Sequence, residues 1–173
     1  MRILIVIVGS LLLACGGGAP TATRTAAPAT PRPATPAATT ASAAALCFLT
    51  PADWQQFNYV TGSSPDVTTD ESGTFCQYAS GLFLEVYPAA SEADAESTFD
   101  TVLENVPMDN PQSVPVPGAD EVAFDADIGD NHAGMAVRAG RLTFFVTGLA
   151  RDTVQAELTT LAGLVLSRSS ALQ

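Results

Sequence analysis

Residues 131–149, NHAGMAVRAGRLTFFVTGL, decide the fold of this chain. The two halves, 131–139 and 141–149, are rich in strand-forming residues and meet at Ala139-Gly140, so the stretch predicts a β-hairpin. An amphipathic helix is expected directly after it, over residues 152–167. The buried stripe of this helix comprises Val154, Leu158, Leu161 and Val165. The segment therefore predicts one ββα unit.

A similar unit precedes it in the sequence. Residues 74–79 and 82–87 predict a hairpin that turns at Ser80-Gly81, and Ser91 begins a helix that runs to about Val106. The apolar positions of this helix are Ala95, Phe99, Val102 and Val106. We expect the strand residues Leu84 or Phe83, Val86, Phe124, Val137, Phe144 and Val146 to be buried.

A constant spacing links the two units. Gly81 and Gly140 lie 59 positions apart, and Phe99 and Leu158 have the same separation. We interpret this spacing as a ββα pseudo-repeat whose strands form one sheet and whose helices both pack on it, with Phe99 and Leu158 at equivalent core sites. The alternative is coincidence, because any two amphipathic helices can be aligned along their apolar stripes.

The remaining segments complete the predicted architecture. Thr50-Pro51-Ala52-Asp53 predicts the start of a short N-terminal helix, with Thr50 as the cap and Asp53 reaching back to it. Residues 61–74 and the proline-rich 107–117 are expected to be loops, and 119–125 a strand. The predicted fold class is α+β: an antiparallel sheet carrying two helices, built from two ββα pseudo-repeats plus the short N-terminal helix.

The N-terminus has the features of an export signal. Arg2 precedes an apolar run, residues 3–14, which is shorter than the roughly 20 residues that span a bilayer. Leu12-Leu13-Ala14-Cys15 resembles the lipobox of bacterial lipoproteins. The resemblance implies that residues 1–14 are a signal peptide and that Cys15 receives a diacylglyceryl group and becomes the new N-terminus.

A long segment of simple composition follows Cys15. Residues 15–45 consist mostly of Ala, Thr and Pro after a glycine run, and have little apolar surface to bury. We interpret them as the lipidated N-terminus and a disordered tether, stiffened by its prolines. The folded α+β domain is then expected over residues 46–173.

The charge of the chain restricts its partners. The sequence has 18 acidic residues, seven arginines and no lysine, and every acidic residue lies at or after Asp53. Only Arg138, Arg141, Arg151 and Arg168 follow the tether, which leaves that part with a net charge of −14. Nucleic acid is excluded as a partner, because its binding requires cations that neutralise phosphates. The acidity either keeps the domain soluble or forms a surface that collects cations.

Cysteine usage predicts one disulfide. Cys15 is assigned to the lipid, and Cys47 and Cys76 remain as an even pair in an exported chain, where disulfides persist. The alternative is a two-cysteine metal or redox site, but the chain has no C-x-x-C motif and no second ligand pair.

Three stretches resemble a broad group of secreted bacterial lipoproteins, most of them of unknown function. The stretches are LCFLTPAD at 46–53, CQY at 76–78 and PGADEV at 117–122. Members of the group share a Cys-x-Leu-Leu-Thr opening, a second cysteine before the first hairpin, and a Gly-x-Gly-Asp-Glu-Ala turn. Their small domain is similar to the extracytoplasmic sensor domains of some mycobacterial receptor kinases. The resemblance implies an α+β fold with one disulfide and supplies no catalytic residues.

Motifs for catalysis or cofactor binding are lacking in the sequence. The single histidine, His132, has no nucleophile motif beside it, and the sequence contains no phosphate-binding glycine loop and no zinc spacing. No cofactor is therefore expected. The acidic stretch 125–131 resembles a calcium loop faintly, with Asp125, Asp127, Asp130 and Asn131 as candidate ligands, although the acid expected twelve positions in is replaced by Ala136.

These observations predict a lipid-anchored binding or sensing protein on the outer face of the cell membrane, without catalysis. The protein would bind a small molecule or an envelope protein. The lipid on Cys15 would attach it to the membrane. The candidate ligand-binding residues are Trp54 and Met108, near an apolar pocket between sheet and helix. The alternatives are a structural envelope-interaction lipoprotein and an enzyme that depends on carboxylates such as Asp120 and Glu121.

Overall fold

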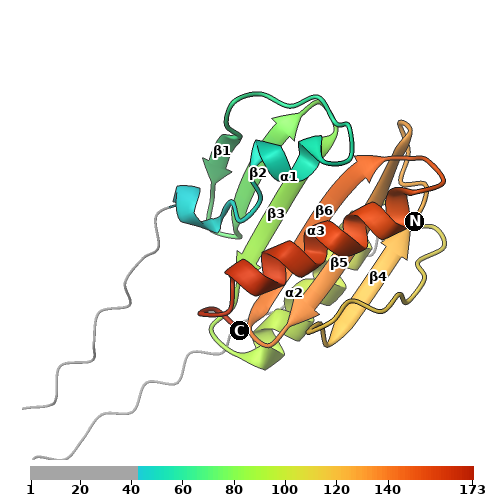
Figure 1. Ribbon diagram of the computed structural model, residues 1–173. Coiled ribbons are helices and arrows are strands. Elements are labelled where there is room, and N and C mark those ends of the chain that lie inside the picture. The colour runs from blue at the N-terminus through green and yellow to red at the C-terminus, as the bar shows by residue number, and fades with distance from the viewer. Residues whose placement is uncertain (1–42) are drawn as a thin grey trace, which may run out of the picture. The chain divides into compact units, whose positions relative to one another are not determined.

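The computed structural model describes residues 43–173. The predicted signal peptide, Cys15 and nearly all of the predicted tether lie outside these residues. The described residues form an α+β domain whose six strands make one antiparallel sheet in the order β1-β2-β3-β6-β5-β4, as Figure 1 shows. The expected fold class is confirmed. Within the described part of the chain, every helix is too short or too polar to span a membrane.

The helices and strands lie close to the predicted positions. The strands are β1 Asp66–Thr69, β2 Thr74–Ala79, β3 Leu82–Pro88, β4 Glu121–Asp125, β5 His132–Ala139 and β6 Leu142–Leu149. The helices are the 3₁₀ turn η1 Ala43–Leu46, α1 Pro51–Gln55, α2 Glu92–Asn105 and α3 Val154–Arg168. The prediction of a loop over residues 61–74 is wrong at β1, because this edge strand is exposed on both faces and its sequence therefore lacks an alternating apolar pattern.

The sheet is buried on both faces at its centre. Every residue of β6 except the last is buried, and successive side chains of a strand point to opposite faces. Phe144 belongs to the core on the face that α3 covers, here the front face, whereas Phe145 belongs to the core on the opposite back face. Figure 1 shows α3 in front of the sheet and α2 behind it. The domain therefore has three layers around β5 and β6.

The predicted pseudo-repeat is not confirmed, and its expected helix packing is wrong. Leu158 packs in the front core with Phe144, whereas Phe99 packs in the back core with Phe145. The physical reason is the continuous apolar run of β5 and β6, which needs cover on both faces, so two helices on one face would leave Phe145 in water.

The strands of the two units are nevertheless arranged alike. The tight turns lie between Ala79 and Leu82 and between Ala139 and Leu142, so the paired residues that flank them are 60 positions apart. Gly81 is the second residue of its turn and Gly140 the first, and both have positive φ. Equivalent strand residues of the two hairpins are thus 60 positions apart, whereas the apolar helix positions are 59 apart. The 59-residue spacing of Gly81 and Gly140 therefore does not mark equivalent positions in the two turns.

The N-terminal segment, residues 46–60, covers the front face of β2 and β3 beside α3. The predicted disulfide is confirmed: Cys47 is bonded to Cys76 of β2, and their Cα atoms lie 5.8 Å apart. Trp54 of α1 is fully buried, with its ring 5.7 Å from that of Tyr59 and 5.2 Å from that of Tyr78. The segment thus completes the front core.

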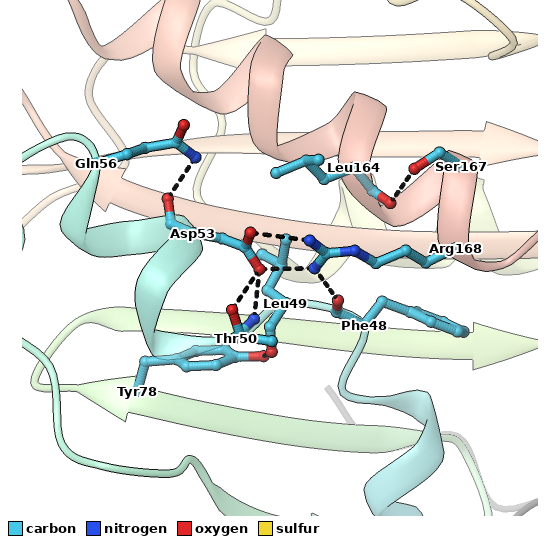
Figure 2. A network of polar contacts seen from close by, with 9 residues as sticks. All are labelled: Phe48, Leu49, Thr50, Asp53, Gln56, Tyr78, Leu164, Ser167 and Arg168. Atoms are coloured by element: carbon cyan, nitrogen blue, oxygen red, sulfur yellow. Dashed lines mark hydrogen bonds and ion pairs between the residues drawn. The ribbon is translucent and has the colours of Figure 1, made fainter.

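A network around Arg168 fixes this segment to the end of α3 (Figure 2). The Arg168 guanidinium donates to the Phe48 carbonyl at 2.6 Å and to both carboxylate oxygens of Asp53, at 2.6 and 2.9 Å. Asp53 also accepts the backbone N–H of Thr50 at 2.6 Å, as the capping motif predicts. The hydrogen bonds from Arg168 are the main reason that the pKa of Asp53 is lowered from 3.8 to about 2.

A second arginine holds the other end of the segment. Arg151 donates to the Phe57 carbonyl at 2.7 Å and to the buried carboxylate of Glu157 at 2.6 Å, and it lies over the ring of Tyr59. Tyr59 donates to the same carboxylate at 2.8 Å. Burial alone would raise the pKa of Glu157, but the hydrogen bonds from Arg151, Thr153 and Tyr59 outweigh it and lower the pKa.

The Arg168 network generates a prediction about acid stability. We expect Arg168→Gln to lower the free energy of unfolding at pH 6 by about 1–3 kcal/mol, because Asp53 loses its charged donor. A carboxylate with a lowered folded pKa stabilises the fold above its unfolded pKa, and this stabilisation is lost as the pH falls through the folded value. The difference between wild type and variant should therefore shrink between pH 3.8 and about 2.

Urea unfolding followed by the fluorescence of Trp54, the only tryptophan, measures this difference. Arg141→Gln, which changes an exposed arginine in the β5–β6 turn, is the matched control and should leave stability nearly unchanged. A difference between wild type and Arg168→Gln that stays constant from pH 6 to pH 2 would contradict the assigned role of Asp53.

Candidate functional site

The back face of strands β1, β2 and β3 is a part of the sheet that the described helices leave largely open. Helix α2 packs mainly on β5 and β6 and touches β3 only at its margin. The side chains of Phe75, Phe83 and Tyr87 on this back face are consequently half-buried. The residues that precede them in β2 and β3, whose side chains point to the front face, are buried. The rings of Phe75 and Phe83 lie 5.1 Å apart, and that of Phe83 lies 5.9 Å from buried Phe145. An aromatic strip thus runs from the core to the open surface.

A groove of about 760 Å³ lies between Tyr87 and α2, and a smaller hollow of about 260 Å³, lined by Phe75 and Tyr87, adjoins it. The two share Ser72, Glu85 and Tyr87, so we treat them as one site, the aromatic groove. Helix α2 forms the opposite wall. That wall comprises Asp94, Ser97, Thr98, Thr101, Val102, Asn105 and Val106. The larger volume lies within the range of small-molecule sites in proteins.

The strand sequence explains why these side chains meet. In β3, residues 82–88, the apolar Leu82, Leu84 and Val86 face the front core, and strand alternation places Glu85 and Tyr87 on the back face. Gly73 lets the ring of Tyr87 approach the backbone closely: a Cβ there would lie 2.7 Å from Cδ1 of that ring.

The turn before β2 closes one end of the groove. Asp70 accepts the backbone N–H groups of Ser72 and Gly73, at 2.8 and 3.1 Å, and also the Ser72 hydroxyl. The same hydrogen bonds, led by that of the Ser72 side chain, lower the pKa of Asp70. The Asp70 carboxylate therefore fixes the turn, and Ser72 and Gly73 are held against the groove.

The groove is acidic. Its lining contains four acids, Asp70, Glu71, Glu85 and Asp94, and no arginine of the described chain. Tyr87 donates its hydroxyl to the Oε2 atom of Glu85, and burial followed by this hydrogen bond raises the pKa of Tyr87 above its usual range. Tyr87 therefore remains a neutral donor, and the Glu85 carboxylate lies at the aromatic wall with its Oε1 atom unengaged by any described residue.

A second groove, of about 1140 Å³, lies beside the edge strand β4, between α2 and the proline-rich loop. Gln112 of that loop pairs with Phe124, which covers part of the strand edge. The acids in its wall, Asp120 and Glu121, are both engaged by Arg138 at 3.4 and 3.1 Å. Both of its acids are thus already paired with an arginine within the fold.

The predicted ligand-binding residues lie away from the aromatic groove. Trp54 is fully buried in the front core, on the opposite side of the sheet. Met108 is half-buried and packs against the back core around Phe99 and Phe145, but it does not line the groove. The structure therefore gives both residues packing contacts.

The candidate calcium residues are engaged in turn formation. Asp125 is buried and accepts the backbone N–H groups of Asn110 and Asp127, at 2.9 and 3.1 Å. Asp127 accepts the N–H of Gly129, and Asp130 and Asn131 adopt positive φ in the turn into β5. Over residues 43–173, no three His, Cys, Asp or Glu side chains gather closely enough to hold a metal ion.

Residue patterns alone did not reveal the aromatic groove. Glu85 and Tyr87 could have been found from the alternation of β3, which assigns them and Phe83 to the face opposite Leu84 and Val86. What the sequence does not show is that α2 leaves this part of the face open, because the lateral position of a helix on a sheet is set by tertiary packing.

Comparison with known proteins gives no further indication of function. No protein-family model matches the chain, and no curated protein matches it significantly.

Proposed function

We propose that this protein is a lipid-anchored binding or sensing protein that works outside the cell membrane and holds a small ligand in the aromatic groove. The lipobox-like Leu12-Leu13-Ala14-Cys15 supports the anchor. The Cys47–Cys76 disulfide supports an exported location, since disulfides persist in oxidising compartments. The tether of residues 15–45 would hold the domain away from the bilayer.

The aromatic groove is the observation that carries the binding function. Large aromatic side chains are usually well buried, yet Tyr87 is only half-buried beside a cavity of about 760 Å³, and Phe75 is half-buried beside the adjoining hollow. The groove combines Tyr87 on its strand side with a largely polar wall of α2, so a ligand would meet apolar surface and hydrogen-bonding groups in one concave site. Burial of these aromatic surfaces by a ligand would supply the free energy of binding.

The anchor predicts where the protein is found. We expect Cys15→Ser to release the protein from the membrane fraction or to leave the precursor uncut, because serine cannot form the thioether to the lipid. Fractionation with mass measurement of the N-terminus checks this, and Thr21→Ser is a control that should stay membrane-bound. A Cys15→Ser protein that remains in the membrane with a processed N-terminus would show that the lipid assignment is wrong.

The groove predicts where small molecules bind. We expect members of a library of small metabolites and fragments to perturb the NMR amide signals of residues that line the groove, with the full chain held in phosphatidylcholine nanodiscs. Thr101→Phe should weaken these ligands by about tenfold or more, because a phenyl ring on the exposed face of α2 fills the groove.

Ala93→Phe is the matched control, because Ala93 is exposed on the same helix and does not line the groove. This variant should keep the affinity of the wild type. If no member of the library perturbs the groove, or if Thr101→Phe leaves every affinity unchanged, the proposed binding function is wrong.

A further inference from the structure

We infer that the aromatic groove selects an amphipathic organic cation: an ammonium group held at Glu85 and an apolar body laid between the aromatic strip and α2. This inference rests on the proposed function and names the chemistry of its ligand. It is drawn from the charges, the free acceptor atoms and the aromatic surfaces of the groove, each of which favours the same class of molecule.

The charge of the groove favours a cation. The carboxylates of Glu71, Glu85 and Asp94 line it, and no described arginine neutralises them there. The four arginines after the tether lie elsewhere. Arg168 pairs with Asp53, Arg151 with Glu157, and Arg138 with Asp120 and Glu121, whereas Arg141 lies in the β5–β6 turn. With a net charge of −14 after the tether, the domain repels anions and disfavours a second copy of itself as the occupant.

The hydrogen bonding at Glu85 leaves room for one more donor. Its Oε2 atom accepts the Tyr87 hydroxyl, whereas its Oε1 atom has no partner among the described residues. An ammonium group is a donor without an acceptor, so it fits a carboxylate oxygen that lacks a donor. Asp94, by comparison, is engaged by the Ser91 hydroxyl at 2.7 Å in the cap of α2. Asp94 and Glu71 also keep a carboxylate oxygen without a described donor, but neither lines the hollow that holds the rings of Phe75 and Tyr87. Glu85 lines both hollows, so Glu85 is the specific contact and the other two carboxylates add to the negative potential.

The walls of the groove suit the rest of such a ligand. The rings of Phe75 and Tyr87 adjoin Glu85, and an aromatic face attracts a cation placed over it. Across the groove, Val102 of α2 and Val106 at its C-cap add apolar surface to an otherwise polar wall, and this surface can contact the hydrocarbon part of the ligand. A purely inorganic cation would leave these walls unused, so an amine with an aromatic or aliphatic body is the better match.

Three probes of similar shape and different charge test the inference. They are the phenethylammonium cation, neutral 2-phenylethanol and the phenylacetate anion. Each is titrated into the full chain in phosphatidylcholine nanodiscs while the amide signals of groove residues are followed, and empty nanodiscs correct for partition into the lipid. We expect phenethylammonium to bind about tenfold more tightly than 2-phenylethanol, and phenylacetate to bind more weakly than both.

Two isosteric variants separate the direct contact of the ligand with the Glu85 carboxylate from the general effect of the domain's negative charge. Glu85→Gln should weaken phenethylammonium about tenfold and leave 2-phenylethanol unchanged, because glutamine keeps an acceptor for Tyr87 but loses the charge. Asp100→Asn removes one charge from α2 at an exposed position outside the groove and should alter neither affinity appreciably.

The possible results distinguish a failure of the cation inference from a failure of the proposed binding function. If the neutral or anionic probe perturbs the groove as strongly as the cation, or if Glu85→Gln leaves the preference intact, the cation inference is wrong and the groove remains a binding site. If other library members perturb the groove and phenethylammonium does not, the inference is equally overturned. If nothing perturbs the groove, the proposed function itself fails.

Discussion

The burial of β6 on both faces is the constraint on which the rest of the structure depends. Phe144 and Phe145 are adjacent in sequence and point to opposite sides, so each side of the sheet needs its own cover. The front face is covered mainly by α3 and the N-terminal segment, whereas the back face has one helix, α2, with Met108 and Ile128 packed beside it. This unequal cover leaves the back of β1, β2 and β3 open, and the aromatic groove is its direct consequence.

The front cover depends on covalent and ionic ties as well as on packing. The N-terminal segment contains only five residues of α-helix, too few to be stable alone. The Cys47–Cys76 bond fixes one end to β2, Arg168 fixes its middle, and Arg151 fixes its far end to Glu157. These ties let the segment bury Trp54 on the front of β2 and β3. Two of the four arginines after the tether are thereby committed to structure, and Arg138 pairs with Asp120 and Glu121, so the groove stays acidic.

The sequence predicts the local structure well, because the signals are local. The first hairpin turn, the Ser91 cap of α2 and the disulfide agree with the structure, and the second turn, at Gly140-Arg141, lies one residue after its predicted position. The face that each helix covers is a tertiary property, so the expected packing of Phe99 and Leu158 on one side was wrong. The apolar run of β6 contains the missing information, since alternation is absent where both faces are buried. Trp54 illustrates the same limit: a lone tryptophan on a short helix fits a core and a binding site equally well.

The measurement that tests the central claim most directly is the accessibility of the aromatic rings to a soluble paramagnetic probe. A neutral gadolinium chelate broadens the NMR signals of protons that it can approach from solvent. The ring protons of Phe75 and Tyr87 should broaden strongly, while those of Trp54 and Tyr78, buried on the front face of the same strands, should remain sharp. If the rings of Phe75 and Tyr87 are as protected as that of Trp54, the back face is covered and the groove does not exist in solution.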